Sequence, residues 1–189
     1  MKKLLYAIVA LTLLAGCKQA SQNAETDTSD NKKTTLVAYF SASGTTEAVA
    51  QLLAQAADAD LLQIEPENVY TDNDLNWRDS LSRSSVEMRD ASARPALKSA
   101  PADLSQYDKV FIGFPIWWGV APRIINTFIE SANLEGKTII PFATSGESPI
   151  EPATEALRAD YPNLNIIDGC LLNDITFEDI SNWIEELKK

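Results

Sequence analysis

The sequence predicts an α/β fold in which a doubly wound, five-stranded parallel sheet is covered by helices on both faces. From residue 35 onward, apolar runs rich in strand-forming residues alternate five times with helical patterns. Two of these runs, 109–114 and 138–142, are apolar on both faces, as expected for strands buried under helices on each side. The roughly 155 residues after position 33 suit one domain with a sizeable core.

The first half of this domain contains three predicted strands and two predicted helices. The strands are the runs 35–41, 60–66 and 109–117. Pro66 ends the second of them, because proline cannot donate to the hydrogen bonds of a sheet. Residues 46–58 have the spacing of an amphipathic helix. Residues 75–91 also have helical spacing, but their polarity predicts a helix that lies on the surface.

The second half completes the alternation with three helices and two strands. A helix is predicted at 123–132, directly after Pro122, and proline is tolerated in a first helical turn. A strand at 137–145 is followed by a helix at 150–161. The fifth strand is expected at 163–172, and a helix at 176–189 closes the chain with leucine, tryptophan and isoleucine on one face.

The N-terminal residues predict export and a lipid anchor. Residues 1–17 combine two lysines with an apolar run that is too short to span a bilayer, which is typical of a signal peptide. The "LAGC" at its end resembles a lipobox, and this resemblance implies that Cys17 is lipidated; an ordinary signal peptide is the alternative. Residues 18–33 lack aromatic and branched apolar side chains and are expected to be a flexible tether. The domain at 34–189 is then exported and anchored to a bacterial membrane in the cell envelope.

The composition excludes several classes of chemistry. Histidine is absent, which excludes Ser-His-Asp and Cys-His catalysis and most catalytic zinc sites. Without Lys2 and Lys3, 14 basic and 27 acidic residues leave a net charge of −13, which argues against nucleic-acid binding. An acidic surface suits a basic protein partner, although a merely solvated surface is equally compatible. With Cys17 lipidated, Cys170 has no disulfide partner and is expected to be a small buried hydrophobe.

Three loops follow predicted strands at the edge where parallel sheets bind ligands. The first supplies four hydroxyls, a glycine and the free amides of a helix start, which together favour an anion; its members are Ser41, Ser43, Gly44, Thr45 and Thr46. An ordinary helix cap is the alternative. The second places Trp117 and Trp118 beside Gly119, flat surfaces for stacking on a planar ring or else part of the core. The third, around Ser145, offers backbone amides or is a plain turn.

The stretches "YFSASGTTEAVA", "FIGFPIWWGVAP" and "GKTIIPFATSGES" resemble the three cofactor loops of a flavodoxin. The similarity is greater to the bacterial flavodoxin-like family whose third strand ends in Pro-Ile-Trp-Trp-Gly. Residues 78–97 also resemble the long, arginine-rich insertion of that family, and the match covers nearly all of 34–189. The resemblance implies strand order 2-1-3-4-5, with FMN as the cofactor at the point where the strand order reverses.

The resemblance also assigns residues to parts of FMN. The first loop would hold the phosphate through Ser41, Ser43, Gly44, Thr45 and Thr46. The second would flank the isoalloxazine ring and ribityl chain through Pro115, Ile116, Trp117, Trp118 and Gly119. The far edge of the ring would meet Thr144, Ser145 and Gly146. Residues 144–149 include no tyrosine or tryptophan, so the two-sided aromatic sandwich of typical flavodoxins is not predicted, and an open flavin face would suit a second substrate.

Three functions follow as hypotheses. The favoured one is an FMN-dependent electron carrier that docks with a redox partner protein through its acidic face. An NAD(P)H-dependent reductase of quinones or other small acceptors is the second. The arginines of the insertion could then contact a nucleotide phosphate, with surface charges on a polar helix as the alternative; they are Arg78, Arg83, Arg89 and Arg94. A lipid-tethered module that binds a ligand without turnover is the third. No catalytic acid–base pair and no metal site is predicted.

Overall fold

The computed structural model describes residues 34–101 and 103–188. The expectations for the signal peptide, for lipidated Cys17 and for the tether at 18–33 lie outside these residues. None of the described helices combines the length and the apolar character needed to cross a bilayer.

A parallel sheet forms the centre of the domain, and its order β2-β1-β3-β4-β5 confirms the predicted order 2-1-3-4-5. A further short strand, β6, pairs with β4. The strands are β1 (Thr35–Tyr39), β2 (Asp60–Gln63), β3 (Lys109–Pro115), β4 (Thr138–Thr144), β5 (Asn165–Ile166) and β6 (Cys170–Leu171).

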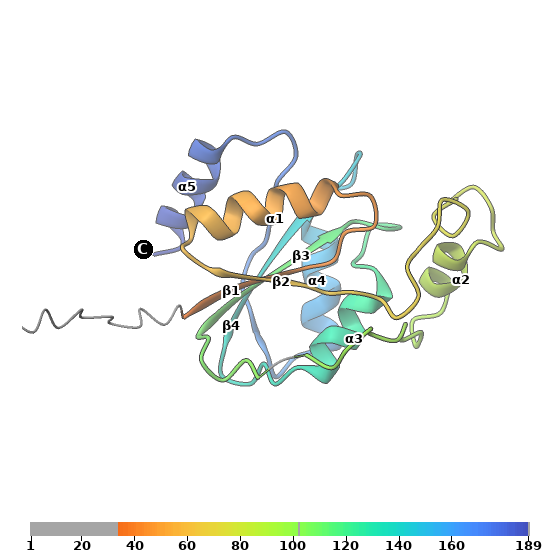
Figure 1. Ribbon diagram of the computed structural model, residues 1–189, viewed down its shortest axis with the longest axis horizontal. Coiled ribbons are helices and arrows are strands. Elements are labelled where there is room, and N and C mark those ends of the chain that lie inside the picture. Colours follow the sequence, from red (N-terminus) through yellow and green to blue (C-terminus); the bar gives the residue numbers. More distant parts are fainter. Residues whose placement is uncertain (1–33, 102, 189) are drawn as a thin grey trace, which may run out of the picture. The chain divides into compact units, whose positions relative to one another are not determined.

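Helices cover both faces of this sheet, as the doubly wound fold predicts (Figure 1). They are α1 (Thr45–Ala56), α2 (Arg83–Arg89), α3 (Arg123–Ser131), α4 (Glu151–Asp160) and α5 (Phe177–Glu186). Successive strand residues point to opposite faces, so Val37 belongs to the apolar cluster that includes residues of α1 and α5, whereas Leu36 belongs to the cluster that includes residues of α3 and α4. The core therefore consists of two apolar layers separated by the sheet.

The fifth strand is not continuous, so the prediction of one strand at 163–172 was wrong. The backbone pairs with β4 at β5 and again at β6, with a gap at 167–169. The cause lies in β4. The carbonyls of Ile139 and Ala143 accept hydrogen bonds from the amides of Ile167 and Leu172, so the backbone groups of both residues face the fifth strand. Pro141 lies midway between them, and alternate residues of a strand face the same neighbour, so Pro141 also faces the fifth strand. Since proline has no N–H, the ladder is interrupted opposite it.

The predicted surface helix at 75–91 is also shorter than expected, because only Arg83–Arg89 is helical. It belongs to a long segment between β2 and β3 that we call the excursion, residues 67–96. Its two ends are joined by the Glu67 N–H, which donates to the Ala96 carbonyl at 2.8 Å, and the flanking residues Pro66 and Leu97 form an antiparallel bridge. Figure 1 shows the excursion, with α2, beyond one end of the sheet.

Tyr70 fastens the excursion to the domain. Its buried ring lies 5.7 Å from the Phe40 ring and 5.4 Å from the Trp117 ring, centroid to centroid. The Arg83 guanidinium covers the tyrosine at 3.9 Å, a cation–π contact. The hydroxyl donates to Glu87 at 2.6 Å, and Glu87 also pairs with Arg83. The excursion is thus held by an aromatic cluster that reaches the end of β1.

The buried tyrosines predict a loss of stability at alkaline pH. Burial, with the Glu47 carboxylate nearby, raises the pKa of Tyr39 to about 12, and burial with the hydrogen bond to Glu87 also raises the pKa of Tyr70. Unfolded tyrosine ionises near pH 10. The free energy of unfolding should therefore keep this contribution below about pH 10 and lose it as the pH rises toward 12. Urea denaturation across this range should show a smaller loss in Tyr70→Phe, and equal losses would contradict the assignment.

Candidate functional site

The three predicted loops meet at one edge of the sheet. They follow β1, β3 and β4, three adjacent parallel strands whose carboxyl ends lie side by side. A buried hydrogen bond of 2.8 Å between the Thr46 and Thr144 hydroxyls joins the first loop to the third. The amide of Ile116 donates to the carbonyl of Thr144 at 2.9 Å and joins the second to the third.

The first loop leaves the start of α1 open. Gly44 precedes the helix with a φ of 87°, and no side chain caps the amides of the first turn. The Ser41 hydroxyl instead accepts from the Gly44 N–H at 3.1 Å, and the exposed Ser43 and Thr45 hydroxyls lie 3.3 Å apart. The helix-cap alternative therefore does not account for these hydroxyls. Thr46 differs from the other three because it is 1% exposed and bonded to Thr144, so it joins loops instead of offering a free hydroxyl.

The second loop is a tight hairpin. Trp117 and Val120 exchange both backbone hydrogen bonds, at 3.0 and 3.1 Å, around two residues with positive φ, Trp118 at 49° and Gly119 at 81°. This is the pattern of a two-residue turn that usually carries Asn-Gly. The Trp117 ring packs edge-on against Phe40 and Tyr70, whereas Trp118 is 52% exposed. Trp117 is therefore partly buried against the core, and Trp118 is presented to solvent.

The positive φ of Trp118 predicts a backbone strain that a substitution at this position can relieve. A bulky residue at positive φ is strained by roughly 1–2 kcal/mol, and asparagine adopts this region more readily. We expect Trp118→Asn to raise the free energy of unfolding of the ligand-free protein by about 1 kcal/mol. Urea denaturation measures this change in the free energy of unfolding. Trp77→Asn is the matched control, because Trp77 is also an exposed tryptophan but does not have a positive φ. A lower midpoint for Trp118→Asn than for wild type would refute the strain.

The third loop is fixed by a residue that the sequence analysis missed. Asn173, just after β6, accepts a hydrogen bond from the Ser145 N–H at 2.9 Å and donates to the Ser145 carbonyl. The Ser145 hydroxyl in turn accepts from the Ser148 N–H at 2.8 Å. The Ser145 amide is therefore engaged, and of the three predicted residues Thr144, Ser145 and Gly146 only Gly146 is exposed. The sequence feature that could have identified Asn173 is its position directly after a predicted strand, at the edge where the three loops lie.

A cavity of about 480 Å³ lies between the first two loops and the excursion. Its walls are mostly apolar and include three tryptophans. The lining residues are Ala42, Ser43, Leu75, Trp77, Ser84, Pro115, Ile116, Trp117 and Trp118. The sequence analysis anticipated the wall from the second loop but not the opposite wall of Leu75, Trp77 and Ser84. An apolar cavity of this size with a few polar groups in its lining is typical of a small-molecule site.

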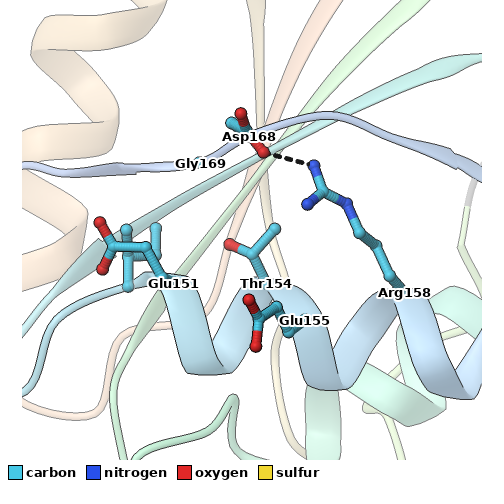
Figure 2. Close-up of a pocket in the computed structure, with 7 residues that line it drawn as sticks. Glu151, Thr154, Glu155, Arg158, Asp168 and Gly169 are labelled. Atoms are coloured by element: carbon cyan, nitrogen blue, oxygen red, sulfur yellow. Dashed lines mark hydrogen bonds and ion pairs between the residues drawn. The ribbon is translucent and has the colours of Figure 1, made fainter.

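A second cavity, of about 210 Å³, lies between α4 and the break at 167–169 (Figure 2). Glu151, Glu155 and Asp168 line it, and Arg158 pairs with Asp168 at 2.7 Å. Its lining includes no aromatic ring and none of the three loops, so it does not suit a planar ligand. No cluster of histidine, cysteine or carboxylate side chains suited to a metal ion occurs in residues 34–101 and 103–188.

Two solved structures closely resemble the domain. A candidate flavoprotein from Bacteroides uniformis is 54% identical over 80% of this chain and 97% of its own, with a TM-score of 0.79. One from Bacteroides eggerthii is 50% identical over 82% and 98%, with a TM-score of 0.80. A Lactobacillus acidophilus flavoprotein in complex with FMN shares the fold at 20% identity, over 83% of this chain and 99% of its own, with a TM-score of 0.64.

Two family models match the sequence. Residues 1–17 match the prokaryotic membrane lipoprotein lipid attachment site. No curated protein matches the chain. Residues 34–187, nearly the whole domain, match the flavodoxin model, and the chain therefore belongs to the flavodoxin family.

Proposed function

We propose that this protein binds FMN and carries electrons in the cell envelope. The observation that supports it best is the adjacency of two features at one sheet edge. An apolar cavity walled by tryptophans suits a planar ring, and the hydroxyl-rich, uncapped start of α1 beside it suits a phosphate. Ser43 belongs to both the loop and the cavity lining.

The residues present fit each part of FMN. The phosphate would meet the exposed Ser43 and Thr45 hydroxyls and the free amides after Gly44, so that its oxygens find donors without a lysine. The ring would lie in the cavity beside Trp118, with Ile116 excluding water. Bound FMN would supply the redox chemistry, while the chain binds and orients it and sets its surroundings.

The arginines of the excursion favour the carrier over the reductase. Arg83 is occupied by Glu87 and the Asn68 carbonyl, and Arg94 forms two 2.8 Å hydrogen bonds with Glu130 on α3. Arg89 donates to the Ser80 carbonyl at 2.6 Å. Three of the four arginines expected to contact a nucleotide phosphate thus have structural roles. Arg78, which lies over Trp77, is the remaining candidate for that contact and keeps the NAD(P)H-dependent reductase as the second function.

The proposed location follows from residues 1–17, whose match to a lipid attachment site supports an anchor on Cys17. Residues 18–33 would then connect the lipid to the domain. The net charge of −11 of the whole chain makes a basic face the expected docking surface on a redox partner.

Spectroscopy of the chain from Lys18 onward tests the proposal. The purified protein should be yellow, or should become so with added FMN. Under anaerobic conditions, bleaching by dithionite or a partner reductase but not by NADPH supports the carrier. Rapid bleaching by NADPH, with recovery on addition of a quinone, would assign the reductase instead. A colourless protein that takes up no FMN would refute both.

A further inference from the structure

We infer that Trp77 of the excursion forms the second aromatic wall of the flavin site, facing the wall formed by the Trp117–Val120 hairpin. This inference rests on the proposed binding of FMN. It assigns a ligand contact to a residue outside all three loops that the family resemblance supplies.

The cavity is bounded on one side by the sheet edge and on the other by the excursion. Pro115, Ile116 and Trp118 come from the end of β3 and the hairpin after it, whereas Leu75 and Trp77 come from the excursion. A ring bound in the cavity would therefore have Trp117 and Trp118 of the hairpin, and Trp77 of the excursion, as its aromatic neighbours. The third loop, which has no aromatic residue, does not line the cavity at all.

The backbone that carries Trp77 is ordered by its own hydrogen bonds. Asp74 accepts from both the amide and the hydroxyl of Thr71, at 2.9 and 2.7 Å, and the Thr71 carbonyl accepts from Leu75 at 3.1 Å. The Ser84 N–H donates to the Asp74 carbonyl at 2.9 Å and ties this turn to α2. The backbone next to Trp77 is consequently fixed beside the cavity and needs little reordering when a ligand binds.

The side chain itself is largely exposed and is one of the residues that line the cavity. Trp77 is 65% exposed, a costly state for a large aromatic ring. The Arg78 guanidinium stacks on the indole at 4.7 Å, and Arg78 is absent from the described residues that line the cavity. A guanidinium covers one face of an indole, so the inference places the ligand against the other face of Trp77.

Ligand truncation and substitution test this assignment together. Because the proposed contact is to the flavin ring, Trp77→Ala should lower the affinity for FMN and for riboflavin by the same factor, about 3- to 10-fold. Trp77→Phe should restore most of the affinity. Leu81→Ala is the matched control, since Leu81 is an exposed apolar residue of the excursion that does not line the cavity. Titration of apoprotein by flavin fluorescence gives the dissociation constants, and urea midpoints without ligand should stay unchanged because the ring is exposed.

Wild-type affinity for both flavins in Trp77→Ala would overturn the inference while leaving FMN binding intact. A loss in Trp77→Ala that Leu81→Ala reproduces, or that phenylalanine does not restore, would also overturn it. Wild-type protein that binds neither flavin would refute the proposed function itself.

Discussion

Replacing Gly113 with alanine is expected to lower the free energy of unfolding by about 2–3 kcal/mol, a large effect for a single methyl group. Gly113 lies in β3 opposite Phe142 of β4. A Cβ built on Gly113 would lie 2.1 Å from Cζ of Phe142 and 2.5 Å from its Cε2. Phe142 is fully buried, so its ring has no free space into which it can move. The close contact would push apart β3 and β4, the two strands that carry the second and third loops.

Denaturation in urea measures this cost, and two further variants make it specific. Gly146→Ala is the matched control, because a Cβ there meets nothing within 4 Å and the backbone φ is not positive. Phe142→Leu shortens the opposing side chain, so Gly113→Ala should cost less in that background, and the difference is the coupling between the two positions. Equal costs for Gly113→Ala in both backgrounds would contradict the proposed clash.

The central strands were predictable because their signal is carried by their own residues. β3 and β4 are continuous apolar runs, and any parallel sheet that accommodates them must bury both faces. The break at 167–169 was not predictable in this way. It depends on Pro141, a residue of the neighbouring strand, and only the pairing register shows that this proline faces the fifth strand.

The excursion shows how local hydrogen bonds compete with helical periodicity. Residues 75–91 have helical spacing, yet the Asn76 side chain accepts from the Arg78 N–H at 3.3 Å and the Asp79 side chain from the Leu81 N–H at 2.8 Å. These bonds occupy amides that a helix would need. The helix begins only after Ser82, whose hydroxyl accepts from the Ser85 N–H.

The candidate site was predictable to the extent that topology determines it. Loops after adjacent parallel strands must meet at one edge, and the sequence marks those loops clearly. It does not distinguish Thr46, which is buried and bonded to Thr144, from the exposed Thr45 beside it. Trp77 and Asn173 reach the site from segments whose placement depends on tertiary packing, so local sequence carried only a weak signal for either.

Ser43→Asp is expected to weaken FMN binding at least about 100-fold while leaving riboflavin binding nearly unchanged. A carboxylate about 4 Å from a phosphate dianion costs several kcal/mol at the effective dielectric of a protein surface, and 1.4 kcal/mol corresponds to a tenfold change in affinity. Ser43 is exposed, so the substitution should change the free energy of unfolding by less than about 0.5 kcal/mol. Flavin fluorescence titration with both ligands measures the effect.

Ser43→Asn separates charge from shape in this experiment, because asparagine has the size of aspartate without its charge. The neutral variant should retain FMN far better than Ser43→Asp, and both should bind riboflavin alike, since riboflavin lacks the phosphate. Raising the salt concentration should recover part of the FMN affinity of Ser43→Asp by screening the repulsion. If Ser43→Asp lowered the affinity for FMN and for riboflavin equally, the ring, and not the phosphate, would lie against the first loop.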